Sequence, residues 1–189
     1  MEDFASVLVP LLAATLRMAT PLILCAMGGL FAERSGIIDV GLEGKMLASA
    51  FVAGTVAALT GSPWIALLAA IVMSQAMALL HGFACITHRG NQVVSGVAIN
   101  MLASGLTAVF SVAWFHMGGA TPNLRPYARF MPIHWPGADT AANVPLIGPL
   151  YAQLVSGHSL LVYAALGSVF LTWWVVARTR FGLRLRAVG

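Results

Sequence analysis

Three long stretches of the sequence contain no Asp, Glu, Lys or Arg, and they constrain the fold more than any other feature. They lie between Lys45 and Arg89, between Arg89 and Arg125, and between Asp139 and Arg178. About 20 apolar residues in a helix cross the roughly 30 Å hydrocarbon core of a bilayer, and a charge at its centre costs several kcal/mol. Each stretch therefore has room for one or two helices that span a membrane.

The composition agrees with a membrane protein. Charged residues make up 8% of the chain and hydrophobic residues 59%, whereas a soluble domain carries about 25% charged residues. Most basic residues fall in short loops, so the net charge of +4 reflects membrane topology, and we expect no nucleic-acid binding. Cys25 and Cys85 both lie inside apolar runs, which is typical of small buried hydrophobes rather than of a disulfide or a metal pair.

The apolar runs predict an all-α, polytopic transmembrane helix bundle with about five spans. They cover residues 4–31, 46–60, 64–87, 92–117 and 157–177. Two runs leave alternatives open. The first run contains Arg17 and Pro21 and is compatible with two short pieces bent there. The second run has only fifteen residues, which is compatible with a tilted or half-spanning helix.

The distribution of basic residues predicts the orientation. Residues 32–45, the turn at 88–91 and the tail at 178–189 together carry seven Lys and Arg residues, against Arg125 and Arg129 on the opposite side. Because Lys and Arg in short loops remain in the cytoplasm, we expect the tail inside the cell. The N-terminus and the connection at 118–156, which contains six prolines, are then extracytoplasmic.

Small and polar residues recur on one face of the fourth run at helical spacing. They are Gln92, Gly96, Asn100, Ser104, Thr107 and Ser111. One interpretation is a seam at which helices approach closely and hydrogen bond. The other is the wall of a solute path, in which the predicted lining residues are Gly96, Asn100, Ser104 and Thr107. Asn100 is the strongest of these because its amide both donates and accepts. The two interpretations can hold for different ends of the stripe.

A second stripe lies on the third run, at Ser74, Met77, His81, Cys85 and His88. It supplies no carboxylate, and His88 lies at the membrane edge. The pattern therefore favours a packing seam, and we expect no metal site.

The densest polar segment, residues 32–45, carries Glu33, Arg34, Asp39 and Glu43 together with Lys45. It is compatible with a solvated loop or with irregular backbone at the membrane edge, which is tolerated where protein buries it or where it lines a water-filled cavity. Its glycines do not have the spacing of a phosphate-binding loop, and the sequence has neither a zinc-protease motif nor a nucleophile elbow. We therefore expect neither an enzyme nor a cofactor.

Three segments together resemble a known family. They are PLILCAMGGLFAERSGIIDVGLEGKM at 21–46, NQVVSGVAINMLASG at 91–105 and RTRFGLRLRAVG at 178–189. They resemble the permease subunits of bacterial ABC importers of the branched-chain-amino-acid, ribose and simple-sugar type, in the subgroup similar to nucleoside-uptake permeases. Asp39, Lys45 and Gln92 depart from the pattern, which has an amide, an apolar residue and a carboxylate there.

The resemblance implies a multi-pass permease of the cell inner membrane that imports a small polar solute by alternating access. Nucleosides are the first choice of solute and simple sugars the second. The implied partners are a separate ABC ATPase subunit, a second permease subunit and an extracytoplasmic solute-binding protein. Residues 1–189 would form a single transmembrane permease domain, which in this family continues beyond Gly189 into a coupling helix. Arg180, Arg184 and Arg186 would then approach the ATPase. The alternative is a structural membrane subunit that does not transport.

Overall fold

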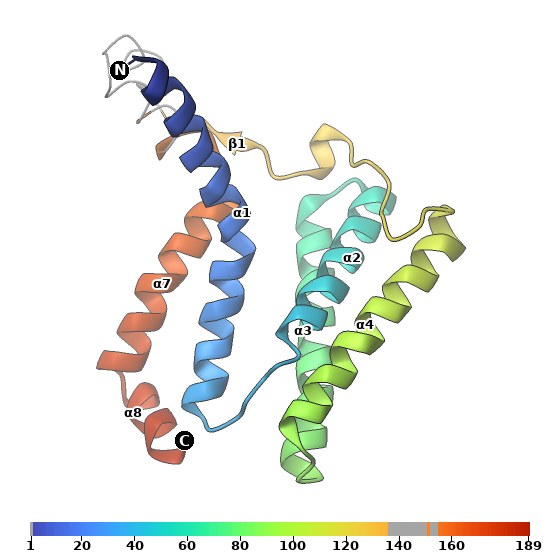
Figure 1. Ribbon diagram of the computed structural model, residues 1–189, viewed down its shortest axis with the longest axis vertical. Helices are drawn as coiled ribbons and strands as arrows, with labels where there is room; N and C mark the ends of the chain where they lie inside the picture. Colours follow the sequence, from blue (N-terminus) through green and yellow to red (C-terminus); the bar gives the residue numbers. More distant parts are fainter. Residues whose placement is uncertain (1, 136–150, 152–154) are drawn as a thin grey trace. The chain divides into compact units, whose positions relative to one another are not determined.

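A computed structural model describes residues 2–135, 151 and 155–189. Helices dominate the chain, and a single two-residue strand pair accompanies them in the described part (Figure 1). In chain order the elements are α1 (Glu2–Arg34), α2 (Leu42–Thr60), α3 (Pro63–Gly82), the π-helical turn η1 (Phe83–Thr87), α4 (Gln92–Phe115), the 3-10 turn η2 (Pro126–Ala128), β1 (Pro132–Ile133), β2 (His158–Ser159), α7 (Leu160–Arg178) and α8 (Arg180–Val188).

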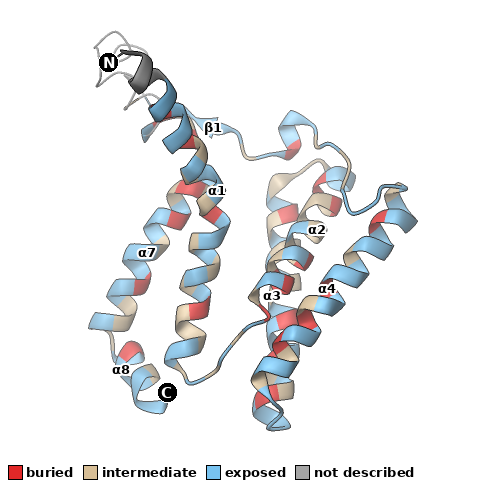
Figure 2. Ribbon diagram, viewed as in Figure 1, coloured by how far each residue is buried: buried red, intermediate tan, exposed pale blue. Residues whose placement is uncertain are grey.

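Five of the described helical segments are long and apolar enough to cross a membrane. They are Val7–Arg34, Leu42–Thr60, Pro63–Thr87, Gln92–Phe115 and Leu160–Arg178. Large apolar side chains such as Leu79, Met101 and Phe170 are exposed over most of their surface, and exposed residues cover much of each helix (Figure 2). Lipid tails are as apolar as these side chains, so a membrane does not require their burial. The predicted fold class is confirmed.

The first helix corrects one alternative left open by the sequence. α1 continues without a break through Pro10, Arg17 and Pro21, so it does not consist of two pieces. Proline is tolerated inside membrane helices because neighbouring groups and Ser or Thr hydroxyls can bond to backbone carbonyls near the interruption. In the turn before Pro21, the Thr20 hydroxyl donates to the carbonyl oxygen of Leu16 at 2.9 Å.

The second helix is longer than its predicted apolar run. α2 begins at Leu42, four residues before the predicted apolar run, and its 19 residues are enough to span a membrane. Glu43 and Lys45 therefore belong to the first turns of a helix and not to a loop. The irregular segment is only residues 35–41, which we call the link.

The described chain forms two compact units. The first contains residues 1–28 and 130–183, in which β1 pairs antiparallel with β2, so that Pro132 lies opposite Ser159. The second contains residues 29–129 and 184–189 and holds α2, α3 and α4.

Two small cores hold the second unit together. Ala48, Met77, Ile99 and Ala103 form one, and Ala57, Ala66 and Ala128 form the other. The small side chains let the helices approach closely. Met77 in the first core bears out the packing interpretation of the stripe on α3. The break predicted between the second and third runs is also confirmed, because α2 ends at Gly61 with φ +69° and Pro63 begins α3.

Of the proline-rich connection, the structure describes residues 118–135, 151, 155 and 156. Pro136, Asp139, Pro145 and Pro149 lie outside the described residues. Within the described part, Pro126 begins η2 and Pro132 begins β1. Both are positions at which a missing N–H is tolerated.

Candidate functional site along the contact between α2 and α4

The link is held by side chains on one face of α4. The backbone N–H of Ile38 donates to Gln92 Oε1 at 2.7 Å. Asn100 Nδ2 donates to the carbonyl oxygen of Val40 at 3.1 Å, and Asn100 Oδ1 accepts from the N–H of Gly44 at 2.7 Å. The first part of the polar stripe is therefore a seam that satisfies the backbone of an irregular segment.

Asn100 supplies the N-terminal cap of α2 from another helix. The N-cap residue of α2 is Gly41, which has no side chain to bond the free N–H groups of the first turn. Gly44, the third residue of the helix, is the position whose N–H a cap side chain normally satisfies. The contact requires glycine, because a Cβ on Gly44 would lie 2.7 Å from Asn100 Cα and one on Gly96 would lie 2.8 Å from Gly41 N.

A buried ion pair also holds the link, through Lys45 on α2. Lys45 Nζ pairs with Asp39 Oδ2, and the two side chains are only 7% and 10% exposed. Asp39 Oδ1 accepts from the N–H of Gly41 at 3.1 Å and lies 3.8 Å from His81 Nε2 on α3. His81 Nδ1 lies 3.1 Å from Ser95 Oγ on α4. A charge in a membrane bundle is tolerated when it faces inward and is paired, and here the pair ties the link to three helices.

The predicted path residues divide into two groups. Gly96 and Asn100 lie in the seam with the link. Ser104 is exposed and donates to the carbonyl oxygen of Met101 at 3.0 Å, and half-buried Thr107 donates to that of Ala103 at 2.8 Å. These hydroxyl bonds remain within α4, so they do not join it to another helix. A solute path along the stripe stays a prediction.

The predicted membrane-edge residues also separate. Glu33 and Arg34 are exposed in the last turn of α1, and Glu43 is exposed in the first turn of α2. Asp39 alone among these four joins the buried ion pair. The segment is therefore irregular backbone held by protein around Asp39, with solvent-accessible helix ends on either side.

The predicted ATPase-side residues Arg180, Arg184 and Arg186 lie on α8. Thr179 precedes this helix, and its hydroxyl accepts from the N–H of Gly182 at 3.2 Å, which caps the first turn. A basic helix directly after α7 is consistent with the predicted orientation, and the role of its arginines stays a prediction.

At the opposite end of α2 and α4, residues 117–129 form a segment that we call the strap. Ser111 of α4 is fully buried and lies within hydrogen-bond distance of the carbonyl oxygens of Met117 and Ala120. Its hydroxyl also accepts from the N–H of Ala120 at 3.1 Å. At its other end the strap is held by buried Ala128, which packs in the second core.

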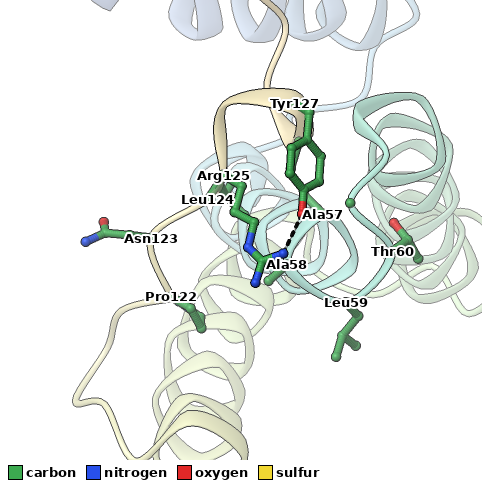
Figure 3. A pocket seen from close by; sticks show the side chains of 11 residues that line it. Ala57, Ala58, Leu59, Thr60, Pro122, Asn123, Leu124, Arg125 and Tyr127 are labelled. Carbon is green, nitrogen blue, oxygen red and sulfur yellow. Dashed lines mark hydrogen bonds between the residues drawn. The ribbon is translucent and has the colours of Figure 1, made fainter.

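A cavity of about 300 Å³ lies between the strap and the end of α2 (Figure 3). Arg125 donates to the Tyr127 hydroxyl at 2.7 Å, and its guanidinium lies 5.9 Å from the Tyr127 ring centroid. That hydrogen bond raises the pKa of Arg125 above its ordinary value. The Tyr127 ring lies against Gly61, where a Cβ would approach Cε2 to 2.8 Å. The rim of the cavity carries the positive charge of Arg125. The residues that line the cavity supply no carboxylate to balance this charge, because the sequence has no acidic residue between Glu43 and Asp139.

A groove of about 400 Å³ separates α2 from α4 near the strap. It is lined by Phe51, Val52, Thr55, Val56, Leu59, Trp114 and Phe115. Sequence reasoning assigned no binding role to this groove. It did expect the charged residues of 32–45 to be able to pair with one another, and the structure shows that Lys45 pairs with Asp39. The spacing of Phe51 and Thr55 on one helix face was a usable signal for the groove, but Trp114, which completes it, lies 59 positions after Thr55 in the chain.

These features define a polytopic membrane protein with polar contacts buried inside an apolar helix bundle. Its polar stripe, its glycine contacts and its basic tail coincide with the segments that suggested a permease. The chain belongs to the family of permease components of branched-chain amino acid transport systems, whose profile matches residues 11–189. Together with the five spans, this makes it a multi-pass protein of the cell inner membrane.

Several curated relatives align along nearly the whole chain. The guanosine ABC transporter permease protein NupQ of Bacillus subtilis is 38% identical over 99% of this chain and 58% of its own length. The nucleoside ABC transporter permease protein NupC of Lactococcus lactis is 35% identical over 90% of this chain and 53% of its own. The glucose ABC transporter permease protein TsgB13 of Haloferax volcanii is 28% identical over 90% and 45%, respectively. The chain thus spans about half the length of the relatives it matches. No solved structure matches it.

Proposed function

We propose that this chain is part of the membrane-spanning permease subunit of an ABC importer and that it translocates a small polar solute by alternating access. A nucleoside is the first choice of solute and a simple sugar the second. Family membership supports the transport role, and the functions named for the relatives support the order of solutes. The observation that carries the proposal is the α4 stripe, in which Ser104 and Thr107 remain outside the seam formed by Gly96 and Asn100.

The family also supports a set of partners. ATP is hydrolysed by a separate ATPase subunit, a second permease subunit completes the path, and an extracytoplasmic solute-binding protein delivers the solute. Residues 1–189 act as one transmembrane permease domain. Arg180, Arg184 and Arg186 on α8 face the approach to the ATPase, since they form a basic cluster immediately after α7.

A structural, non-transporting role is the second candidate, and the bonds from Asn100 to the link favour it. Substitution of Ser104 and Thr107 separates the two. In the assembled importer we expect Ser104→Leu and Thr107→Val each to reduce solute uptake at least tenfold, because they remove polar groups from the path, with unchanged protein level and assembly. Uptake of radiolabelled nucleosides and sugars by intact cells measures this.

The matched control for these variants is Met101→Leu, which changes an exposed apolar residue of the same helix for another of similar volume. It should leave uptake unchanged. Full uptake by both path variants would remove the case for a path at this position, and loss of assembly would assign Ser104 and Thr107 to packing instead.

The orientation is tested by labelling single cysteines. With Cys25 and Cys85 replaced by alanine, we expect a cysteine at Arg125 to react with a membrane-impermeant maleimide on intact cells. A cysteine at Arg184 should react only after the membrane is opened, because the basic tail is retained in the cytoplasm. Mass-tag gel shifts report both reactions, and the reversed pattern would invert the topology.

A further inference from the structure

The groove between α2 and α4 has the lining of a binding site for a flat ring. α2 and α4 touch at Gly44 and Asn100 and diverge toward the strap (Figure 1). Where they diverge, the rings of Phe51 and Trp114 lie near-parallel, with 6.3 Å between centroids and 23° between planes. Phe110 stacks on Trp114 at 4.8 Å and so restrains the indole. The groove therefore presents a braced aromatic surface.

One polar group in the groove lining has no partner. Thr55 is 6% exposed, and its hydroxyl oxygen is buried without a hydrogen bond. Two other hydroxyls of α2 bond to the carbonyl four residues earlier, Ser49 at 2.6 Å and Thr60 at 2.7 Å. A buried hydroxyl without a partner is unfavourable. Because threonine in a helix occupies two side-chain rotamers, a rotamer change can present this hydroxyl to a molecule in the groove.

We propose that this groove binds the heteroaromatic base of the imported solute, with Trp114 as the stacking surface and Thr55 as the hydrogen-bonding group for the base edge. A nucleobase has apolar faces and a polar edge, which matches this combination, whereas a sugar has no extended flat face. A base cannot lie between Phe51 and Trp114, because two contacts of about 3.5 Å exceed the 6.3 Å between the rings. For the base to enter, the Phe51 side chain has to turn aside, and the base then stacks on the face of Trp114 that Phe51 leaves, while Phe110 continues to restrain the indole. The inference rests on the proposed function and adds which part of the solute is recognised, and where.

The position of the groove suits a step on a route through the protein. Leu59 lines both the groove and the cavity under the strap. On α4, Trp114 follows Thr107 by seven residues, which places both on one helix face. The groove thus lies between the positively charged cavity and the predicted path residues.

The first test measures uptake by the full importer. For Trp114→Leu we expect the KM for guanosine and uridine to rise at least tenfold, the size of effect expected when base stacking on an aromatic ring is lost. For Thr55→Val, which keeps the shape but removes the hydroxyl, we expect a rise of about five- to tenfold, and Thr55→Ser should restore uptake. Ribose uptake, where it occurs, should be unchanged in all variants. Phe170→Leu, an exposed aromatic of α7, is the control and should behave as wild type.

The second test measures binding without transport. In the purified importer in lipid nanodiscs, guanosine should quench tryptophan fluorescence and ribose should not. Trp114→Phe should abolish that quenching, and Thr55→Val should shift its midpoint to about tenfold higher guanosine concentration.

The outcomes separate this inference from the proposed function. Normal guanosine uptake and quenching in the Thr55 and Trp114 variants would overturn the groove assignment and leave the importer intact. An equal loss of ribose and guanosine uptake would also overturn it, since the groove would then serve packing. Quenching at Trp114 by guanosine in a wild-type protein that imports neither nucleosides nor sugars would support the groove and reject the proposed function. Absence of both uptake and quenching would reject both.

Discussion

Lys45→Met should destabilise the protein by about 3–5 kcal/mol, because removing one partner of a buried ion pair leaves the other charge uncompensated. Asp39 would remain only 10% exposed, close to His81. The double variant Asp39→Asn/Lys45→Met should recover most of this loss. It removes both charges, and the asparagine oxygen can still accept from the N–H of Gly41. Unfolding in mixed SDS micelles, followed by tryptophan fluorescence, gives the free energies.

Glu43→Gln is the matched control for the ion-pair cycle. Glu43 lies in the same turn of α2 as Lys45, but it is exposed, so its substitution should change the free energy of unfolding by less than about 0.5 kcal/mol. If Lys45→Met and the double variant are equally unstable, then the charges of Asp39 and Lys45 do not stabilise each other. Lys45 would in that case act through the packing of its aliphatic chain.

Gly44→Ala should force α2 and α4 apart where Gly44 meets Asn100. The new methyl group would meet Asn100 Cα at 2.7 Å and Oδ1 at 2.8 Å, and backbone atoms cannot move aside as a flexible side chain does. Overpacking of this kind costs about 1–3 kcal/mol, and loss of the Asn100 cap adds about 1 kcal/mol. The melting temperature of the detergent-solubilised protein should fall accordingly.

The control uses the same substitution on the facing helix. Gly105 of α4 has no atom within 4 Å of a built Cβ, so Gly105→Ala should be neutral or stabilising by up to about 1 kcal/mol, since alanine favours the helix. Equal melting temperatures for the two alanine variants would contradict the close α2–α4 contact.

Much of the fold was predictable because a bilayer imposes a simple rule on sequence. Charge-free stretches identified four of the five described spans, the apolar run at 4–31 identified the first one despite Arg17, and Gly61-Ser62-Pro63 identified a helix break. The start of α2 was missed because Glu43 and Lys45 resemble loop residues when they are considered locally. Their place in a helix depends on Asn100, which is 56 residues from the Gly44 N–H that it bonds.

The candidate site was predictable only in part, for a related reason. Helical spacing placed Gly96, Asn100 and Ser104 on one face of α4, but it could not say which of them already had partners. That depends on what lies opposite, and the link approaches only the first half of the stripe. The missing hydrogen bond of Thr55 is likewise a property of tertiary packing, so no sequence pattern reports it.

The cap that Asn100 provides has a consequence for biosynthesis. A ribosome makes α2 well before it reaches Asn100, so the nascent helix enters the membrane with its first turn unfinished and its lysine near the interface. Only after α4 has been inserted can Asn100 bond to Gly44 and the first turn be completed. The first turn of one span is therefore completed only after translation has moved two helices ahead, so this bundle does not mature strictly one helix at a time.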